Sequence, residues 1–532
     1  MAIDKKTRQK QGKFYTPAFV SQFCWRVLRA WIGHDMLHHF RVVDPAAGDG
    51  VFLQEPSWQG WVDPERVFGV ELFPGELDHV PLYHLIQGNG LIDQPERGFQ
   101  SGTFDLVIGN PPFGGEGIRG LQDKERKQVL ITILQNYAAW RESVHLSLSS
   151  EQVEEQWFNS KDGLSAAKKF ATCPIEQLFL ERFLMLCKNG GWCVIVLPEG
   201  LLSNYRTRWL REAVSRIASV VAVVSLPSKL FLSEGASART AIVFLRKQPG
   251  LSTPVYLVSP TFFERPNSLA IEDYLKRVEA ELTGAIPIET GVSIGRDQWT
   301  TERWDPGFWD PRLKKSLLKP EYTVEFGEFI ESITYGPILP GRQPEQRDDG
   351  TPIIGQKQLT ESGIDLSNAL HVAVGSAFDL ERSRVRQGDL LLARSGEGSL
   401  LRFKMGVYEE RYPANVSCFV DRIRLQGIDP YYVWLVMKSR FLKMQILRLQ
   451  NGVGAPNLNF REIRGLRIPY FDDNEQLAWR LRYRERVAPL HRQRLRSTAQ
   501  AEKTAWGERA GQEFQRLVQA LEEEIAQRYN LH

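Results

Sequence analysis

FDLVIGNPPFG, residues 104–114, runs an apolar stretch typical of a buried β-strand directly into an asparagine, two prolines and a phenylalanine. Pro111 and Pro112 fix their φ angles near about −65° and have no N–H groups, so the chain after Asn110 is stiff and its carbonyls are left to accept hydrogen bonds. A stiff turn can hold the Asn110 amide, these carbonyls and the Phe113 ring in one arrangement. Taken alone, the same residues also fit an ordinary strand-ending turn with a core phenylalanine.

This strand belongs to a series of apolar stretches between residues 41 and 247. Helical patterns lie between them, such as IEQLFLERFLMLC (175–187), in which apolar residues recur every three or four positions. The alternation predicts a doubly wound, Rossmann-like α/β domain, in which ligands bind at the carboxyl ends of the strands beside the topological switch point. The other expected strands lie in RVVDPAAGDG (41–50), RVFGVEL (66–72), YHLIQGNGLI (83–92), GWCVIVLPEG (191–200), VAVVSLP (221–227) and TAIVFLRK (240–247).

The composition is that of a globular chain with several domains. Its 532 residues correspond to roughly three or four domains, and a hydrophobic content of 42% is ample for packed cores. No stretch approaches the ~20 apolar residues of a membrane span, and no apolar segment follows the charged start, so we expect a cytoplasmic protein. The five cysteines lack CxxC or Cys/His ligand spacing, which argues against a zinc site or a disulfide framework. The net charge of +3 is compatible with nucleic-acid binding without indicating it.

Two acidic residues follow the first two expected strands. Asp44 precedes a turn of small residues that lets a ligand approach the backbone, and Glu71 stands where a carboxylate can accept from two ribose hydroxyls. The turn lacks the GxGxxG pattern, which disfavours a pyrophosphate cofactor and leaves a nucleoside-binding arrangement. Considered separately, Asp44 could be a helix N-cap and Glu71 a surface acid.

Four short motifs now carry a resemblance to a known family. They resemble, in order, those of the gamma-class DNA amino-methyltransferases, which use S-adenosylmethionine; the motifs are GKFYTP (12–17), DPAAGDG (44–50), GVEL (69–72) and NPPF (110–113). The resemblance implies that the cofactor is contacted by Tyr15 and Thr16 at its methionine end, by Asp44, Ala46 and Gly48 in the pocket, and by Glu71 on the ribose. Where the family commonly has an acid that accepts from the adenine amino group, this sequence has Asn89, whose amide oxygen could do the same more weakly.

The resemblance also gives the turn at residues 110–113 a chemical role. The exocyclic nitrogen of adenine is a poor nucleophile, and Asn110 Oδ1 with the Pro111 carbonyl would accept its two N–H bonds, while Pro112 stiffens the turn. Phe113 would stack on the base, which must be flipped out of the duplex to reach such a pocket. Phe231 stands where the family carries a second aromatic residue, although a core loop position also explains it.

The same turn also serves enzymes that methylate a glutamine amide in a protein, so the rest of the chain is needed to choose. Stretches between about residues 326 and 476, such as VRQGDLLLARSGEGSLLRFKMGVY (385–408), resemble in order the target-recognition half of specificity subunits from type I restriction-modification systems. We therefore expect a C-terminal mixed α+β recognition domain. The expected segments are a methyltransferase domain at 1–283, a linker at 284–315, the recognition domain at 316–474 and a helical tail at 475–532.

Polar loops of the expected recognition domain hold candidate contacts to DNA. Arginine, glutamine and lysine have the donor patterns for base edges and phosphates, although most polar loop residues are merely solvated. We expect DNA contacts from Arg342, Gln356, Arg394 and Lys404, with Phe231 acting on the flipped base.

The tail is rich in arginine up to Arg496 and then becomes acidic. Its helices could pack against a partner, follow phosphates or pack on their own chain. No PD…ExK nuclease pattern is found, and we expect a monomer, with a dimer through the tail left open.

The resulting prediction is a site-specific adenine methyltransferase of double-stranded DNA in a restriction-modification or phage-defence system, with or without a separate restriction or defence subunit. The alternatives are a protein-glutamine methyltransferase and a recognition subunit with vestigial catalysis.

Overall fold

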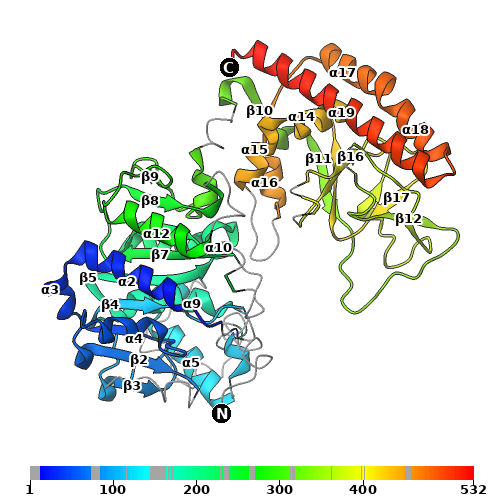
Figure 1. Ribbon diagram of the computed structural model, residues 1–532. Helices are drawn as coiled ribbons and strands as arrows, with labels where there is room; N and C mark the ends of the chain where they lie inside the picture. The colour runs from blue at the N-terminus through cyan, green and yellow to red at the C-terminus, as the bar shows by residue number, and fades with distance from the viewer. Residues whose placement is uncertain are drawn as a thin grey trace. The chain divides into compact units, whose positions relative to one another are not determined.

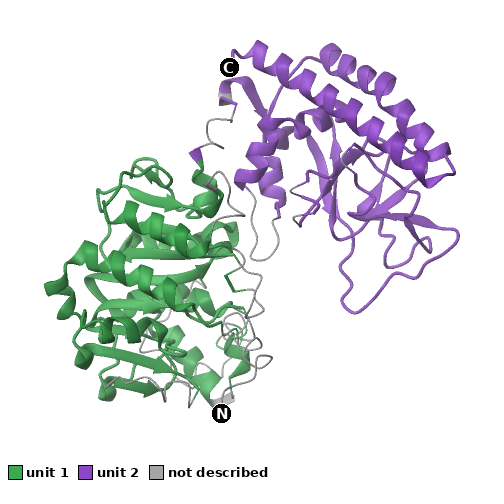
Figure 2. Ribbon diagram, in the orientation of Figure 1, with its two compact units in different colours: residues 1–310 green, residues 311–532 purple. Residues whose placement is uncertain are grey.

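The computed structural model describes residues 12, 14–73, 84–114, 117–121, 123–143, 163, 165, 168, 173–227, 230–231, 239–262, 270–311, 313, 318–360, 362–396, 398–400, 402–449 and 457–531. The chain divides into two compact units, residues 1–310 and 311–532 (Figure 2). Each unit is described by itself. None of the helices in the described part of the chain is both long enough and apolar enough to cross a bilayer.

Unit 1 is built on one nine-stranded sheet with the order β3-β2-β1-β4-β5-β7-β6-β8-β9 (Figure 1). Strands β1 to β5 run parallel, whereas β7 is antiparallel to both of its neighbours and β9 is antiparallel to β8. The strands are β1 (Val42–Asp44), β2 (Val67–Glu71), β3 (His84–Gln87), β4 (Phe104–Gly109), β5 (Cys187–Pro198), β6 (Ser219–Ser225), β7 (Thr240–Arg246), β8 (Val255–Val258) and β9 (Val292–Ile294).

Helices cover both faces of this sheet. Successive residues of a strand point to opposite faces, so the apolar side chains of a buried strand need packing partners on both sides. In β4, Leu106 packs in one hydrophobic core with α2 and α12, and its neighbour Val107 packs in the other with α5 and α9. The mixed α/β architecture expected from the sequence is therefore confirmed. The helices of unit 1 are α2 (Ala18–Ile32), α3 (His34–His38), α4 (Val51–Trp58), α5 (Asp123–Asn136), α6 (Ala138–Ser143), α9 (Ile175–Leu186), α10 (Glu199–Ser203), α11 (Arg208–Ile217) and α12 (Ile271–Leu282).

The order of the strands creates a topological switch point at β1. From β1 the chain continues through β2 to β3 on one side, then returns so that β4 pairs with the other side of β1. Loops that leave the carboxyl ends of β1 and β4 therefore diverge and leave room for a ligand between them. The turn at residues 110–113 begins at this point, directly after β4.

Each of the seven stretches expected to form strands contains one, and two more strands extend the sheet beyond residue 247. One of these, β9, lies within the segment expected as a linker at 284–315, and the two units meet between residues 310 and 311. Three tryptophans pack together nearby: Trp299 stacks on Trp304 and Trp309 at centroid distances of 6.4 and 5.7 Å. The segment is thus folded into unit 1 over residues 292–309.

The described residues of unit 2 form two four-stranded sheets and a two-stranded one. Their orders are β11-β18-β15-β16, β13-β12-β17-β14 and β10-β19, and among these described strands only β12 and β17 pair in parallel. The strands are β10 (Thr323–Glu325), β11 (Ile330–Tyr335), β12 (Thr351–Ile354), β13 (Leu370–Val372), β14 (Arg384–Val385), β15 (Leu390–Ala393), β16 (Met405–Val407), β17 (Ala414–Val416), β18 (Val420–Leu425) and β19 (Arg467–Pro469).

The alternation of side chains along β15 joins three layers of unit 2. Leu391 packs towards the second sheet, whereas Leu390 and Leu392 pack towards the helices. Several helices begin at side-chain caps: Asp429 caps α14, and Asp472 with Glu475 forms a capping box at α17. The helices are α14 (Pro430–Lys438), α15 (Arg440–Leu449), α16 (Phe460–Arg464), α17 (Asp473–Arg486), α18 (Ala488–Arg496) and α19 (Gln500–Arg528).

The helical tail shares the core of unit 2. Phe514 and Leu521 of α19 and Trp479 of α17 are buried in the same cluster as Trp434 of α14. Several tail arginines pair within the chain: Arg480 with Asp429 at 2.9 Å, Arg494 with Asp365 at 2.6 Å, and Arg528 with Glu475. Of the three expected alternatives for the tail, the structure shows packing on its own chain.

Candidate functional site

The switch point brings together the residues that follow β1 and β4. Asp44, the last residue of β1, is buried, and its Oδ1 accepts from the backbone N–H of Ala46 at 2.9 Å. Burial raises the pKa of this carboxyl to about 8, and the charges of Glu71 and Asp49 act in the same direction. Gly109 leaves space for the carboxyl, because a Cβ at that position would lie 2.4 Å from Asp44 Oδ1. The two strand ends therefore fit together only with glycine before Asn110.

Glu71, at the end of β2, holds the turn that follows β1. Its Oε2 accepts from the backbone N–H of Gly48 at 2.9 Å, and its Oε1 accepts from Phe73 N–H at 3.0 Å. Gly48 has a φ of +56°, and the nearest atom to a Cβ built there is Tyr15 Cε1, at 4.0 Å. Three residues predicted for cofactor binding, Tyr15, Gly48 and Glu71, thus lie close together.

Asn89, just after β3, has a more constrained amide than the sequence suggested. Its Oδ1 accepts from Leu91 N–H at 3.0 Å, and its Nδ2 donates to Glu125 Oε1 at 3.3 Å. A Cβ on Gly90 would lie 1.8 Å from the Pro45 carbonyl oxygen, so the loops after β1 and β3 touch. Glu125 of α5 therefore supplies a carboxylate beside the position where the family commonly has an acid.

Arg182 of α9 also contacts the loop after β3. Its side chain is buried, its Nε donates to the Gly90 carbonyl at 2.8 Å, and its Nη2 lies 2.7 Å from Asp93 Oδ1. Sequence analysis missed this residue. The available signal was a charged residue inside the otherwise apolar run IEQLFLERFLMLC, where a buried position requires a partner.

The Asn110 amide is fixed by the N-terminal motif. Its Nδ2 donates to Thr16 Oγ1 at 2.9 Å and to the Phe14 carbonyl at 3.2 Å, which uses both amide hydrogens. Its Oδ1 is buried and has no hydrogen-bond partner among the residues that the structure describes. A buried acceptor without a donor costs free energy, so such a group is a candidate contact for a ligand.

Two further hydrogen bonds hold the turn after Asn110. The backbone N–H of Phe113 donates to the Gly12 carbonyl at 3.1 Å, and that of Gly114 donates to Glu176 Oε2 at 3.3 Å. Burial raises the pKa of Glu176. Gly12 has a φ of +73°, and a Cβ there would lie 2.8 Å from the Phe113 carbonyl oxygen. The turn is thus held by Gly12 and residues 14–16 on one side and by α9 on the other.

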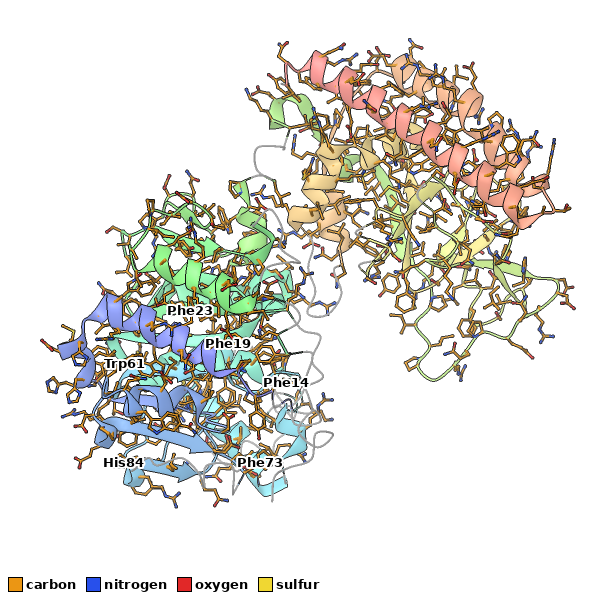
Figure 3. All side chains as sticks on the ribbon, viewed as in Figure 1. Phe14, Phe19, Phe23, Trp61, Phe73 and His84 are labelled. Carbon is orange, nitrogen blue, oxygen red and sulfur yellow. The ribbon has the colours of Figure 1, made fainter. Side chains whose placement is uncertain are left out.

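Three phenylalanines gather at this turn. The Phe113 ring stacks on Phe14 with centroids 4.9 Å apart and an interplanar angle of 29°, and meets Phe231 edge to face at 6.1 Å and 74°. Phe14, labelled in Figure 3, was missed by sequence analysis although it lies within GKFYTP. Phe113 and Phe231, expected on either side of a base, are both buried and in contact. A base stacked between these two rings would require them to move apart.

The predicted DNA contacts in unit 2 lie in two kinds of surroundings. Arg342 is exposed and Lys404 is partly buried. Gln356 Nε2 donates to the Ser395 carbonyl at 2.7 Å, so this amide braces a neighbouring loop. The Arg394 guanidinium lies 3.9 Å from the Tyr335 ring centroid and 3.7 Å from Asp421 Oδ1.

Asp421 is completely buried, and neither carboxylate oxygen has a hydrogen-bond partner within the described part of the chain. Burial raises the pKa of Asp421 to about 7, against the lowering effect of Arg394. Arg394 therefore belongs to an internal cluster of charged and aromatic side chains. Among the described residues, no three His, Cys, Asp or Glu side chains form a group that could hold a metal ion.

Comparison with known proteins supports the fold. Residues 79–261 match the model of the family described as N-6 DNA Methylase. A curated relative, the Defense against restriction protein B of Escherichia phage P1, is 23% identical over 259 residues, which are 48% of this chain. The chain spans only 9% of the length of that protein.

Two solved structures match almost the whole chain. One is the type IIL restriction-modification enzyme MmeI in complex with DNA, with 11% identity, 100% of this chain and 78% of that chain covered, and a TM-score of 0.55. The other is the type IIG restriction endonuclease BpuSI, with 13% identity, 99% and 67% coverage, and a TM-score of 0.45. The segment that matches the N-6 DNA Methylase family includes β3 to β8 and the turn at Asn110.

Proposed function

We propose that the protein transfers a methyl group from S-adenosylmethionine to the exocyclic amino group of an adenine that is flipped out of double-stranded DNA. One observation carries this proposal: both Asn110 amide hydrogens are used by Phe14 and Thr16, while Asn110 Oδ1 is buried as an acceptor without a donor among the described residues. A ligand that donates N–H bonds would satisfy this oxygen. The match of residues 79–261 to the N-6 DNA Methylase family supports adenine as the source of these bonds.

The proposed chemistry needs acceptors rather than a strong base. The lone pair of the adenine amino nitrogen is delocalised into the ring, and two acceptors that draw its N–H bonds out of the ring plane free the lone pair for attack. Asn110 Oδ1 and the Pro111 carbonyl would serve as these acceptors, and they act because the clasped turn holds them in place before the reaction. Phe113 would hold the base after its contact with Phe231 has opened.

The residues at the ends of β1 to β3 fit S-adenosylmethionine. This cofactor, when bound, supplies the methyl group on a sulfonium centre. Glu71 accepts backbone hydrogen bonds from Gly48 and Phe73, and a carboxylate has several acceptor sites, which is the chemistry that ribose hydroxyls require. Tyr15 lies beside Gly48, at the turn where Asp44, Ala46 and Gly48 would line the pocket. Thr16, Asn89 and Glu125 would complete the surroundings.

Unit 2 would supply the recognition of a DNA sequence. Its loops carry the exposed Arg342 and the partly buried Lys404, and contacts from such side chains to base edges and phosphates would select the DNA sequence. The names of the matching proteins, two restriction enzymes and a phage protein for defence against restriction, favour a role connected with restriction-modification. A partner subunit with nuclease activity is compatible with this role, and we propose that the chain acts as a monomer on one strand.

Labelled S-adenosylmethionine tests the proposal. The full chain should transfer label to duplex DNA that contains its site, and mapping of the methylated positions should find N6-methyladenine at one position of a fixed sequence. Strand-resolved mapping would reveal a dimer if both strands of a symmetric motif were modified. Label in protein rather than DNA would favour glutamine methylation, and binding of DNA without transfer would favour a recognition subunit with vestigial catalysis.

A further inference from the structure

We infer that the Thr16 hydroxyl is a positioning group, which together with the Phe14 carbonyl sets the orientation of the Asn110 amide. The inference rests on the proposed function and deepens it, because it names what turns the acceptor end of Asn110 towards the substrate amine. The contacts are those of Asn110 Nδ2, at 2.9 Å from Thr16 Oγ1 and 3.2 Å from the Phe14 oxygen. Thr16 is buried, with 6% of its surface exposed.

Orientation matters because an asparagine amide has two ends of similar size and opposite character. Its oxygen accepts hydrogen bonds and its nitrogen donates two. If the amide were reversed, Nδ2 would face the amino group of the base, and two donors would meet. The rate of transfer therefore depends on which end faces the substrate, and a free asparagine side chain would populate both orientations.

The two partners fix the orientation in different ways. The Phe14 carbonyl can only accept, so it requires the nitrogen of Asn110 on its side. The Thr16 hydroxyl can donate or accept and, once the carbonyl has fixed the amide, it accepts the second N–H. Loss of this hydroxyl would leave one amide hydrogen buried without a partner, which disfavours the productive orientation.

The inference also explains why the N-terminal motif lies beside the turn. Described residues of this motif contact the turn at four places: Gly12 to the Phe113 N–H, the Phe14 ring to Phe113, and the Phe14 carbonyl and Thr16 hydroxyl to Asn110. These contacts reach across more than ninety positions of sequence. A motif that contacted only the cofactor would not need hydrogen bonds to Asn110.

Three variants of the full chain separate this role from cofactor binding. Thr16→Val keeps the shape and removes the hydroxyl, and Thr16→Ser keeps the hydroxyl. At saturating S-adenosylmethionine and DNA, Thr16→Val should lower kcat roughly 10-fold, the cost of one lost buried hydrogen bond, and Thr16→Ser should recover most of that rate. The dissociation constant of S-adenosylhomocysteine should change much less than kcat. Thr103→Val is the control, since it removes a unit 1 hydroxyl that bonds the Gln100 carbonyl and should not change kcat.

A double-mutant cycle of melting temperatures tests the contact between Thr16 and Asn110 without a measurement of methyl transfer. Thr16→Val and Asn110→Ala should each lower the melting temperature, and the double variant should lower it by less than the sum, because both changes remove the same hydrogen bond. Additive shifts would overturn the inference. So would a Thr16→Val variant that weakens only S-adenosylhomocysteine binding, or a Thr16→Ser variant as slow as Thr16→Val. If the wild-type chain methylated no DNA, the proposed function would fail, while the double-mutant cycle would still decide whether Thr16 and Asn110 are coupled.

Discussion

Two side chains, one in each unit, have buried oxygens without a hydrogen-bond donor among the described residues, and the two groups differ in chemistry. One is Asn110 of unit 1, whose Oδ1 belongs to a neutral amide with its nitrogen held by Thr16 and Phe14. The other is the carboxylate of Asp421 in unit 2, which lies 3.7 Å from Arg394 Nη1 and makes no hydrogen bond there. A neutral group stays as it is when pH changes, whereas an acid can take up a proton.

The difference shows how each unit tolerates a buried polar group. Leaving a neutral acceptor unpaired costs on the order of 1–3 kcal/mol, and the rigid turn around Asn110 maintains it for a ligand. Burying an unpaired carboxylate costs far more, so the group shifts its pKa instead, and burial raises the pKa of Asp421 to about 7. Asn110 therefore provides a fixed acceptor at the proposed active site, whereas Asp421 is a group whose charge changes near neutral pH.

The largest effect is expected from removal of the fixed acceptor. Asn110→Ala should lower the rate of methyl transfer by about 10²–10³, because the acceptor contributes most in the transition state. Cofactor affinity should change much less. Single-turnover transfer from labelled S-adenosylmethionine measures the rate, and Asn204→Ala, which removes an asparagine cap in unit 1, serves as the control. Transfer at the normal rate by Asn110→Ala would contradict the proposed mechanism.

The second prediction concerns the group that titrates. The pKa of Asp421 is about 7 in the folded protein and near its ordinary value when unfolded, so the folded state binds the proton more tightly. The contribution of Asp421 to the free energy of unfolding should therefore fall as pH rises from about 4 to about 7. Asp421→Asn removes this decline, and it should stabilise the chain by ~2–4 kcal/mol at pH 8 and by much less at pH 5. Urea unfolding at the two pH values measures the difference.

Asp379, also in unit 2, provides a control of opposite sign. Burial would raise the pKa of Asp379, but hydrogen bonds from Gly375 N–H and Asn415, together with Arg384, lower it below its ordinary value. The ionised Asp379 carboxylate therefore contributes to the free energy of unfolding at neutral pH, and this contribution is lost as pH falls through the pKa of Asp379 in the folded protein. Asp379→Asn should therefore destabilise the protein most at high pH. If Asp421→Asn and Asp379→Asn changed the free energy of unfolding in the same direction at pH 8, the predicted contrast between these two aspartates would be wrong.

The contrast between the units also explains what the sequence could predict. In unit 1, strand ends are set by local patterns, and parallel strands bring their carboxyl ends to one edge, so Asp44, Glu71 and Asn110 could be placed together from the sequence. Partners from helices could not be placed. The helices α5 and α9 pack against the sheet and so bring Glu125, Arg182 and Glu176 to the site. No local sequence pattern specifies this packing.

In unit 2 the sequence identified polar loops but could not assign their partners. Whether a glutamine or arginine in a loop faces solvent or a backbone carbonyl depends on which loops meet, and the loops that carry Gln356 and Ser395 are about forty positions apart. The amide of Gln356 bonds within the chain, and Arg394 lies on Tyr335. The contacts of these residues with DNA stay predictions.

The third prediction tests the partner of the titrating group. Arg394→Ala should destabilise the chain by ~1–3 kcal/mol at pH 8, because Asp421 would lose its counter-ion and Tyr335 its covering guanidinium. The loss should be smaller at pH 5, where the carboxyl carries a proton. Adding Asp421→Asn to Arg394→Ala should recover part of the stability at pH 8. Equal losses at both pH values would show that the stacking, and not the charge pair, stabilises this cluster.

The smallest effect is expected at the exposed arginine. Arg342→Ala should change the free energy of unfolding by no more than about 0.5 kcal/mol, since this side chain is exposed. If Arg342 contacts a phosphate, the variant should reduce by about one the slope of the logarithm of DNA affinity against the logarithm of salt concentration. Gln356→Ala is the matched comparison: it breaks the 2.7 Å bond to the Ser395 carbonyl, so it should lower stability while leaving that slope unchanged, because glutamine carries no charge. A salt slope that Arg342→Ala leaves unchanged would exclude a phosphate contact by this residue and move the proposed DNA interface of unit 2 to other loops.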